Sequence, residues 1–264
     1  MISIIKKIFI KFYITNFLLS YLYMFLDRII YGSKSKIFNK KNLWFHESQF
    51  GLIPYFHPLF KSKIRLEENN NFFFKNYNLK KGDIILEFGS GIGNEALFIS
   101  KKIGNTGKII SFEPNKEIFD LLKMTKKINN LENLIISQSC LYEEDTKIGF
   151  EDKHIEDWLG GKIDKNNLTN SVDAYTLDSI VKKYQLKKIT LCKMNIEGAE
   201  KYILESSNEF FNICENLVIS CHDFIGINTY EMLVSFLKDK DYFLYNNKNY
   251  NENWKNFYIF AKKN

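Results

Sequence analysis

Four residues in one short segment, Glu87, Gly89, Gly91 and Gly93, have the types and the spacing of a nucleotide-binding loop. They follow an apolar run that is typical of a buried strand. Glycine at these positions lets the backbone turn tightly and lets a ligand approach without meeting a Cβ atom. The dinucleotide fingerprint G-x-G-x-x-G would need its last glycine at Asn94. A carboxylate at Glu87 attracts an ammonium group and repels a pyrophosphate, so the loop favours S-adenosylmethionine over NAD.

A second acid, Glu113, ends the next apolar run and precedes Pro114. Its two oxygens can accept hydrogen bonds from both hydroxyls of a ribose. The structural alternative is an acid that the dipole of the following helix stabilises. With the glycine loop upstream we favour the ribose interpretation, and we expect Ser90, Pro114 and Asn195 to complete the cofactor-binding residues.

The candidates for catalysis follow two later strands: Glu197 after one, His222 and Asp223 after the other. Methyl transfer from S-adenosylmethionine requires near-attack geometry, and an acceptor that must lose a proton also needs a base within hydrogen-bond reach. His222 suits that role, because it is the only one of four histidines that follows an expected strand and because imidazole titrates near neutral pH. The alternatives are a local cap made by His222 or Asp223, and a divalent cation held by an acidic cluster. No tight ligand spacing supports a metal, so none is expected.

The elements that must position these residues alternate between strand and helix. Apolar runs predict strands at residues 83–88, 108–112, 134–138, 189–194 and 217–221, with closing strands at 242–245 and 257–261. Amphipathic helices between them predict an α/β fold with a doubly wound, mostly parallel sheet, which binds ligands beyond the carboxyl ends of its strands. The expected domains are a helical extension (1–45), an irregular linker or lid (46–65) and the sheet domain (66–264).

The extension contains an uncharged run, residues 12–26, which is shorter than the ~20 residues of a membrane-spanning helix. Polar residues at helical spacing predict a narrow stripe on an otherwise apolar helix: Lys6, Tyr13, Asn16, Ser20, Tyr23 and Asp27. Such a helix packs on its own domain or on another subunit, or it lies in a membrane interface. We favour packing on protein, because an apolar face at helical spacing usually belongs to a core.

The amino-acid composition limits which binding partners and which cellular compartment we expect for the protein. The net charge is +6, but lysines and acidic residues are mixed along the chain and there are only two arginines, Arg28 and Arg65. Arginine side chains recognise bases through bidentate hydrogen bonds from the guanidinium group. With so few arginines, sequence-specific nucleic-acid binding is not expected. The four cysteines form no C-x-x-C pair, which favours a reducing cytoplasmic setting, with possible membrane association through residues 1–30.

The sequence resembles the FkbM-type methyltransferases of the class I, Rossmann-like superfamily. The resemblance runs through LEFGSGIGNEALFIS, IISFEPN, the Thr176-Leu177-Asp178 helix start and the CKMNIEGAE segment from Cys192 to Glu200. It implies a seven-stranded sheet in the order 3-2-1-4-5-7-6 with the last strand antiparallel. It also implies O-methylation of sugars, glycolipids or natural products. Many relatives have Asp where this chain has Asn195, which argues against a base or a metal ligand at that position.

Overall fold

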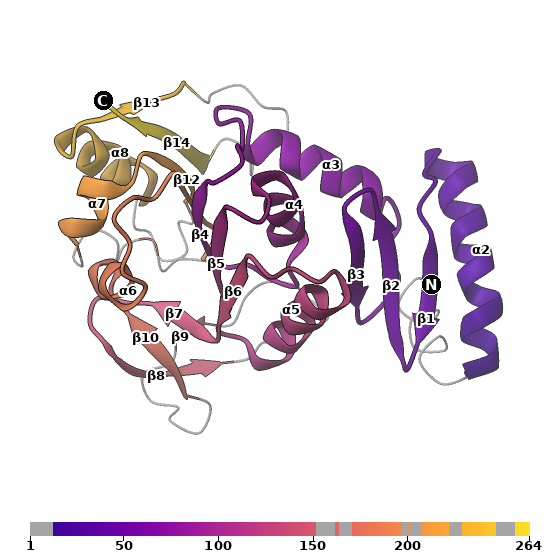
Figure 1. Cartoon of the computed structure of the whole chain (residues 1–264). Helices are drawn as coiled ribbons and strands as arrows, with labels where there is room; N and C mark the ends of the chain where they lie inside the picture. The colour runs from indigo at the N-terminus through magenta and orange to yellow at the C-terminus, as the bar shows by residue number, and fades with distance from the viewer. Residues whose placement is uncertain are drawn as a thin grey trace.

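The computed structural model describes residues 13–151, 162–163, 171–196, 200, 207–221, 229–246 and 257–264. At its centre is a seven-stranded sheet in the order β13-β14-β12-β11-β4-β5-β6 (Figure 1). Its strands are β4 (Ile84–Phe88), β5 (Lys108–Phe112), β6 (Leu134–Ser137), β11 (Leu191–Met194), β12 (Asn216–Ser220), β13 (Tyr242–Leu244) and β14 (Tyr258–Lys263). Strand β14 runs antiparallel to β12 and β13, and the other four pairs are parallel. The predicted doubly wound sheet is confirmed, with the strand order that the resemblance implies.

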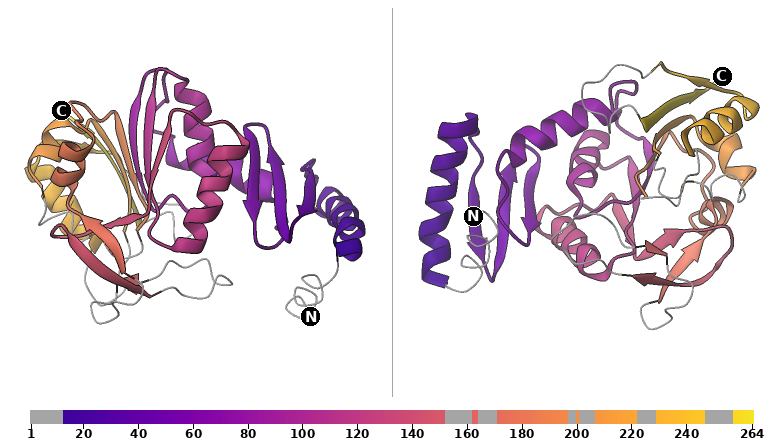
Figure 2. Two further views of the ribbon diagram at one scale, coloured as in Figure 1. Left: turned by 60° about the horizontal axis from the view of Figure 1, so that its bottom comes forward. Right: turned by 180° about the vertical axis from the view of Figure 1, so that it is seen from behind.

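Helices cover both faces of this sheet (Figure 2). One face carries α3 (Ser62–Phe73), α4 (Asn94–Ile103) and α5 (Lys116–Ile128), and the other carries α6 (Leu177–Lys183), α7 (Glu209–Ile213) and α8 (Thr229–Asp239). Neighbouring residues of a strand point to opposite faces. Ile85 and Ile109 therefore enter the core under α3, α4 and α5, whereas Leu86 and Ile110 enter the core under the other three helices.

A second, smaller sheet lies beside the carboxyl end of β6, in the order β7-β10-β8-β9. Its strands are β7 (Ser139–Leu141), β8 (Thr146–Glu151), β9 (Lys162–Ile163) and β10 (Ser171–Tyr175). The strands predicted for the main sheet do not include these four. The expected helix start at Thr176 is confirmed, because its side chain accepts a hydrogen bond from the Ser179 amide at 3.1 Å and α6 begins at the next residue.

The amino-terminal region differs from the expected helical extension and irregular linker. After α2 (Tyr13–Tyr31) come three antiparallel strands, β1 (Ile37–Lys40), β2 (Leu43–Ser48) and β3 (Gly51–Tyr55). The irregular segment expected over 46–65 thus contains half of β2, all of β3 and the start of α3. The hairpin was missed because its two-residue turn is Lys41-Asn42, both at positive φ, instead of the usual Asn-Gly. Pro54 is tolerated because β3 is an edge strand.

The three-stranded sheet is joined to the main domain through β3. Asn129, at the end of α5, accepts a hydrogen bond from the Leu52 amide at 2.8 Å and donates one to the Leu52 carbonyl at 2.7 Å. The Tyr55 hydroxyl donates to Asn94 Oδ1 at 3.0 Å, at the first residue of α4. This sheet is therefore anchored to the two helices that follow β4 and β5.

Helix α2 packs on protein through buried polar residues and through Leu19, Tyr23 and Met24, which are partly buried against the core. Asn16, Ser20 and Asp27 are buried, and Asp27 Oδ1 accepts a hydrogen bond from the Lys61 amide at 2.8 Å. Tyr23 stacks on Phe60 with ring centroids 4.0 Å apart. Packing on protein is as expected, but most of the apolar side faces outward, since periodicity marks two faces of a helix but not which one turns inward. Among the described helices, none combines the length and the hydropathy that crossing a bilayer requires.

One buried histidine makes stability depend on pH. His46 of β2 is 3% exposed, its Nδ1 lies 2.7 Å from Ser62 Oγ, and its Nε2 accepts a hydrogen bond from the Leu59 amide at 3.4 Å. Because Nε2 accepts, Nδ1 carries the proton and the ring is neutral. Burial, with a smaller contribution from His57, lowers the pKa of His46 to about 3.

We expect acid to destabilise the fold through this histidine. The unfolded chain binds a proton at His46 near pH ~6.5, whereas the folded chain binds it only near pH 3, so stability is lost as pH falls through this window. The free energy of unfolding should fall by up to ~1.4 kcal/mol per pH unit from this group. Urea unfolding between neutral pH and pH ~4 measures the slope, and His46→Gln should make it shallower. Equal slopes in the two proteins would contradict the expectation.

Candidate functional site

The glycine loop joins the carboxyl end of β4 to α4, and its glycines have two different roles. Gly89, Gly91 and Gly93 all have positive φ, at 72°, 55° and 91°. A Cβ atom on Gly89 would lie 1.9 Å from the backbone oxygen of Asn195, and one on Gly93 would lie 2.8 Å from Leu122 Cδ1. A Cβ atom on Gly91 would meet nothing within 4 Å. The first and third glycines are needed for packing, whereas Gly91 borders open space that a cofactor can occupy.

Glu113 connects this loop to the carboxyl end of β5. Its Oε2 accepts a hydrogen bond from the Gly91 amide at 2.9 Å, and its Oε1 accepts one from the Asn115 amide at 3.0 Å. Pro114 lies between Glu113 and Asn115, and Asn115 caps α5 by accepting from the Ile118 amide at 2.9 Å. Glu113 thus has the structural role considered as the alternative, and it lies beside the open space over Gly91. Its contact with a ribose stays a prediction.

Ser90 and Asn195 lie next to the loop glycines and Glu113, and we call these residues together the cradle. The Ser90 hydroxyl is buried and lies within hydrogen-bond distance of the carbonyls of Glu87 and Phe112, at 3.2 and 3.3 Å. The Asn195 amide donates to the Phe88 carbonyl at 3.0 Å, which extends the parallel pairing of β11 with β4 by one residue. The fold therefore brings all eight predicted cofactor-binding residues to one edge of the sheet, at the ends of β4, β5 and β11.

Glu87 lies beneath the loop instead of on its surface. Its side chain is 0% exposed, and its Oε2 accepts a hydrogen bond from Ser111 Oγ at 2.8 Å. Its Oε1 lies 3.6 Å from Lys193 Nζ, and the same ammonium lies 3.8 Å from Glu95 Oε2. Register places these groups together, because Glu87 is opposite both Lys193 of β11 and Ser111 of β5. Attraction of a ligand ammonium by Glu87 stays a prediction.

The buried charges stabilise one another. Burial raises the pKa of the Glu87 carboxyl, and the nearby Lys193 ammonium opposes this rise. Burial acts to lower the pKa of Lys193, but the carboxylates of Glu95 and Glu87 raise it overall. Lys193 is therefore the charged partner that the acidic pair requires. Lys193 was not among the predicted site residues, although a lysine inside an apolar strand indicates a buried partner.

The three predicted catalytic residues, Glu197, His222 and Asp223, lie outside the described residues. The chain around them is described up to Ile196 and up to Cys221. Strands β11 and β12 are adjacent and parallel, so both end at the edge of the sheet that carries the glycine loop. In the part of the chain that the structure describes, no group of three or more His, Cys, Asp or Glu could hold a metal ion.

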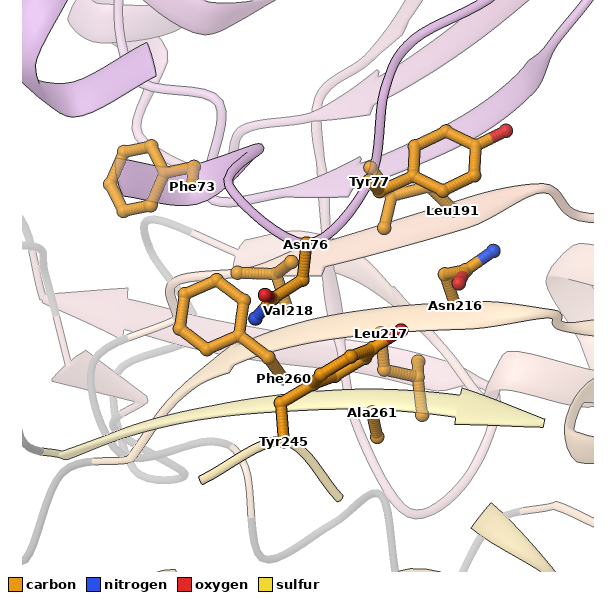
Figure 3. Close-up of a pocket in the computed structure, with 10 residues that line it drawn as sticks. All are labelled: Phe73, Asn76, Tyr77, Leu191, Asn216, Leu217, Val218, Tyr245, Phe260 and Ala261. Carbon is orange, nitrogen blue, oxygen red and sulfur yellow. The ribbon is translucent and has the colours of Figure 1, made fainter. Parts of the chain in front are cut away.

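A small hollow in the structure is separate from this site (Figure 3). Leu191 and Asn216, the first residues of β11 and β12, line it together with Tyr77 and Phe260. The hollow therefore lies at the amino ends of these parallel strands, whereas the glycine loop follows the carboxyl end of β4. In a doubly wound sheet the ligand binds at the carboxyl ends, so the hollow is not the cofactor site.

Removing the Glu113 carboxylate should weaken cofactor binding and also destabilise the fold. We expect Glu113→Ala to weaken binding by about 1–3 kcal/mol, the cost of removing a hydrogen-bonding partner from a buried polar group. The amides of Gly91 and Asn115 would also lose their acceptor, so the free energy of unfolding should fall by a similar amount. Calorimetric titration with S-adenosylmethionine and urea unfolding measure the two effects.

Asn115→Ala is the matched control for Glu113→Ala. It removes the cap of α5 and should cost about 1 kcal/mol of stability without changing cofactor affinity. If Glu113→Ala also lost stability but bound the cofactor with normal affinity, then the only role of Glu113 would be structural, as the acceptor for the amides of Gly91 and Asn115.

Residues 83–244 match the family model of the methyltransferase FkbM domain. Methyltransferase FkbM from Methylobacillus flagellatus KT has a TM-score of 0.49 at 14% identity, over 71% of this chain and 45% of that one. SMU.1697c from Streptococcus mutans, solved in complex with SAH, has a TM-score of 0.48 at 14% identity, over 75% and 97%. Aeropyrum pernix fibrillarin with bound S-adenosyl-L-methionine has a TM-score of 0.44 at 11% identity, over 85% and 97%.

No curated protein matches the chain significantly. The family match covers more than half of the chain and includes the glycine loop, Glu113 and Asn195. The chain therefore belongs to the FkbM methyltransferase family, and its cofactor is S-adenosylmethionine.

Proposed function

We propose that this methyltransferase methylates a hydroxyl oxygen of a sugar, a glycolipid or a natural product, and that it works in the cytoplasm. The observation that carries the proposal is the open space over Gly91, which Glu113 borders at the carboxyl edge of the sheet. The resemblance to FkbM-type enzymes supports the class of acceptor. The four cysteines are free, which supports the compartment.

The cradle would hold the cofactor through backbone and side-chain groups. Glu113 would accept hydrogen bonds from the ribose hydroxyls, Gly91 would let the backbone approach, and Asn195 would close the cradle from β11. Ser90 would keep the loop in shape through its bonds to the two carbonyls. When bound, S-adenosylmethionine supplies an electrophilic methyl group. Preorganised backbone turns reduce the entropy cost of holding it.

The remaining task of the chain is to orient the acceptor and to take up its proton. We assign the proton to His222, which follows β12, with Asp223 beside it and Glu197 after β11 as further polar groups of the site. An imidazole is half-ionised near neutral pH, so it can accept a proton in one step and release it to water afterwards.

A screen of acceptors with methyl-labelled cofactor tests the proposal. Stable label on the hydroxyl-bearing acceptors, as a methyl ether that survives mild alkali, is the expected result. Label on the amines of nucleic-acid bases would contradict the proposal and identify the protein as a nucleic-acid methyltransferase. Cofactor binding without transfer to any acceptor would favour a protein that binds the cofactor without catalysis.

A further inference from the structure

Helix α2 exposes most of its large apolar side chains and buries three polar ones, while Leu19, Tyr23 and Met24 pack partly buried against the core. Six large side chains on its outer side are each at least 57% exposed: Phe17, Leu18, Tyr21, Phe25, Ile29 and Ile30. The stripe of Asn16, Ser20 and Asp27 faces the three-stranded sheet instead. We call the six exposed side chains the outer α2 face. An apolar area of this kind on one element marks an interaction surface.

The basic charge of the protein is concentrated around this helix. Residues 1–46 contain eight lysines and arginines and one acidic residue, Asp27, whereas residues 47–264 contain 29 basic and 30 acidic residues. Asp27 is 0% exposed, so no negative charge of this segment faces solvent in the described structure.

Exposed cations lie near both ends of α2. Arg28 is in its last turn and Lys34 follows it, and both are exposed. Strand β1 then runs back along the helix and ends at Lys40, before the Lys41-Asn42 turn, near the amino-terminal end of α2 (Figure 1). The outer α2 face is thus an apolar band with positive charge at each end.

We infer that the outer α2 face binds the surface of a membrane that contains anionic lipids, with the helix lying in the plane of the interface. Apolar and aromatic side chains would enter the boundary between headgroups and acyl chains, while Arg28 and Lys34 meet lipid phosphates. The polar stripe stays on the protein, so the whole outer side of the helix is available. This inference does not depend on the methyl acceptor.

Charge also argues against a second copy of the chain as the occupant. A two-fold contact through the outer α2 face would bring the same surface of both copies together. The cations near the ends of α2 would then face other cations, with Asp27 buried in each copy. Like charges across an interface are unfavourable, whereas anionic headgroups neutralise them.

Flotation of the full chain with lipid vesicles tests the inference. Vesicles of phosphatidylcholine with a quarter of phosphatidylglycerol should carry the protein, and vesicles of phosphatidylcholine alone should carry much less. The double variant Leu18→Glu/Phe25→Glu should lower partitioning at least about ten-fold, because it removes two side chains that would be buried and adds negative charge. Both side chains are exposed, so the far-ultraviolet circular dichroism spectrum and the thermal midpoint should not change.

A matched control has the same chemistry at the other end of the molecule. Met232 and Phe243 are 44% and 54% exposed on α8 and β13, so Met232→Glu/Phe243→Glu adds the same charge and should partition like the parent. The charge variant Arg28→Gln/Lys34→Gln should lower binding to the anionic vesicles by about five-fold for each charge removed. It should leave binding to phosphatidylcholine unchanged.

Two results would overturn the inference. The first is equal flotation of the parent and Leu18→Glu/Phe25→Glu. The second is a parent that never floats but sediments as a dimer, with the double variant sedimenting as a monomer, which would make a second copy the occupant.

Discussion

Gly91→Val should abolish detectable binding of S-adenosylmethionine while the chain stays folded. A Cβ atom on Gly91 meets no protein atom within 4 Å, so the valine side chain would enter the open space over the loop. The cofactor is expected in that space. Calorimetric titration of the parent and the variant measures the loss directly.

The backbone cost of this substitution needs its own control. Gly91 has a φ of 55°, where a side chain is strained, so some stability should be lost whatever occupies the site. Gly32 has a φ of 65° and also meets nothing within 4 Å of an added Cβ, but it lies at the end of α2. Gly32→Val should lose comparable stability and bind the cofactor normally. Normal binding by Gly91→Val would remove the cofactor from this loop.

His222→Ala should lower the rate of methyl transfer by about 10²–10⁴-fold, the usual contribution of a positioned base. Cofactor affinity should stay nearly unchanged, because the imidazole is expected to meet the acceptor instead of the cofactor. The parent rate should rise with pH as an imidazole loses its proton, and this limb should be missing in the variant. Turnover with a saturating acceptor, measured across pH, gives both results.

Other outcomes for His222 have different meanings. Unchanged turnover would make it a structural cap of the segment after β12. Loss of cofactor binding would place His222 in the cofactor site instead of the acceptor site. Activity that a chelator abolishes and a divalent cation restores would transfer the chemistry to a bound metal.

The strands of the main sheet could be predicted closely because each is a short apolar run with a clear end. The predicted strand at 108–112 coincides with β5, the strand predicted at 83–88 begins one residue before β4, and the strand predicted at 217–221 is shifted by one residue from β12. The glycine loop and Glu113 could be found for a related reason. Chemistry at the carboxyl ends of strands needs particular residue types immediately after the apolar run.

What could not be predicted depends on contacts between distant segments. The burial of Glu87 against Lys193 requires the register of β4 with β11, which neither strand encodes alone. Strands β1, β2 and β3 were missed because the Lys41-Asn42 turn lacks glycine and because Pro54 argues against a strand. The inverted orientation of α2 follows from its packing on that sheet, so it was missed as well.

The most direct test of the central claim is calorimetric titration of the full chain with S-adenosylmethionine, its demethylated product and NADH. The account predicts that the first two bind to one site per chain with micromolar affinity and that NADH does not compete. Glycine spacing and the open space over Gly91 both lead to this expectation. Binding of NADH without binding of S-adenosylmethionine would contradict it.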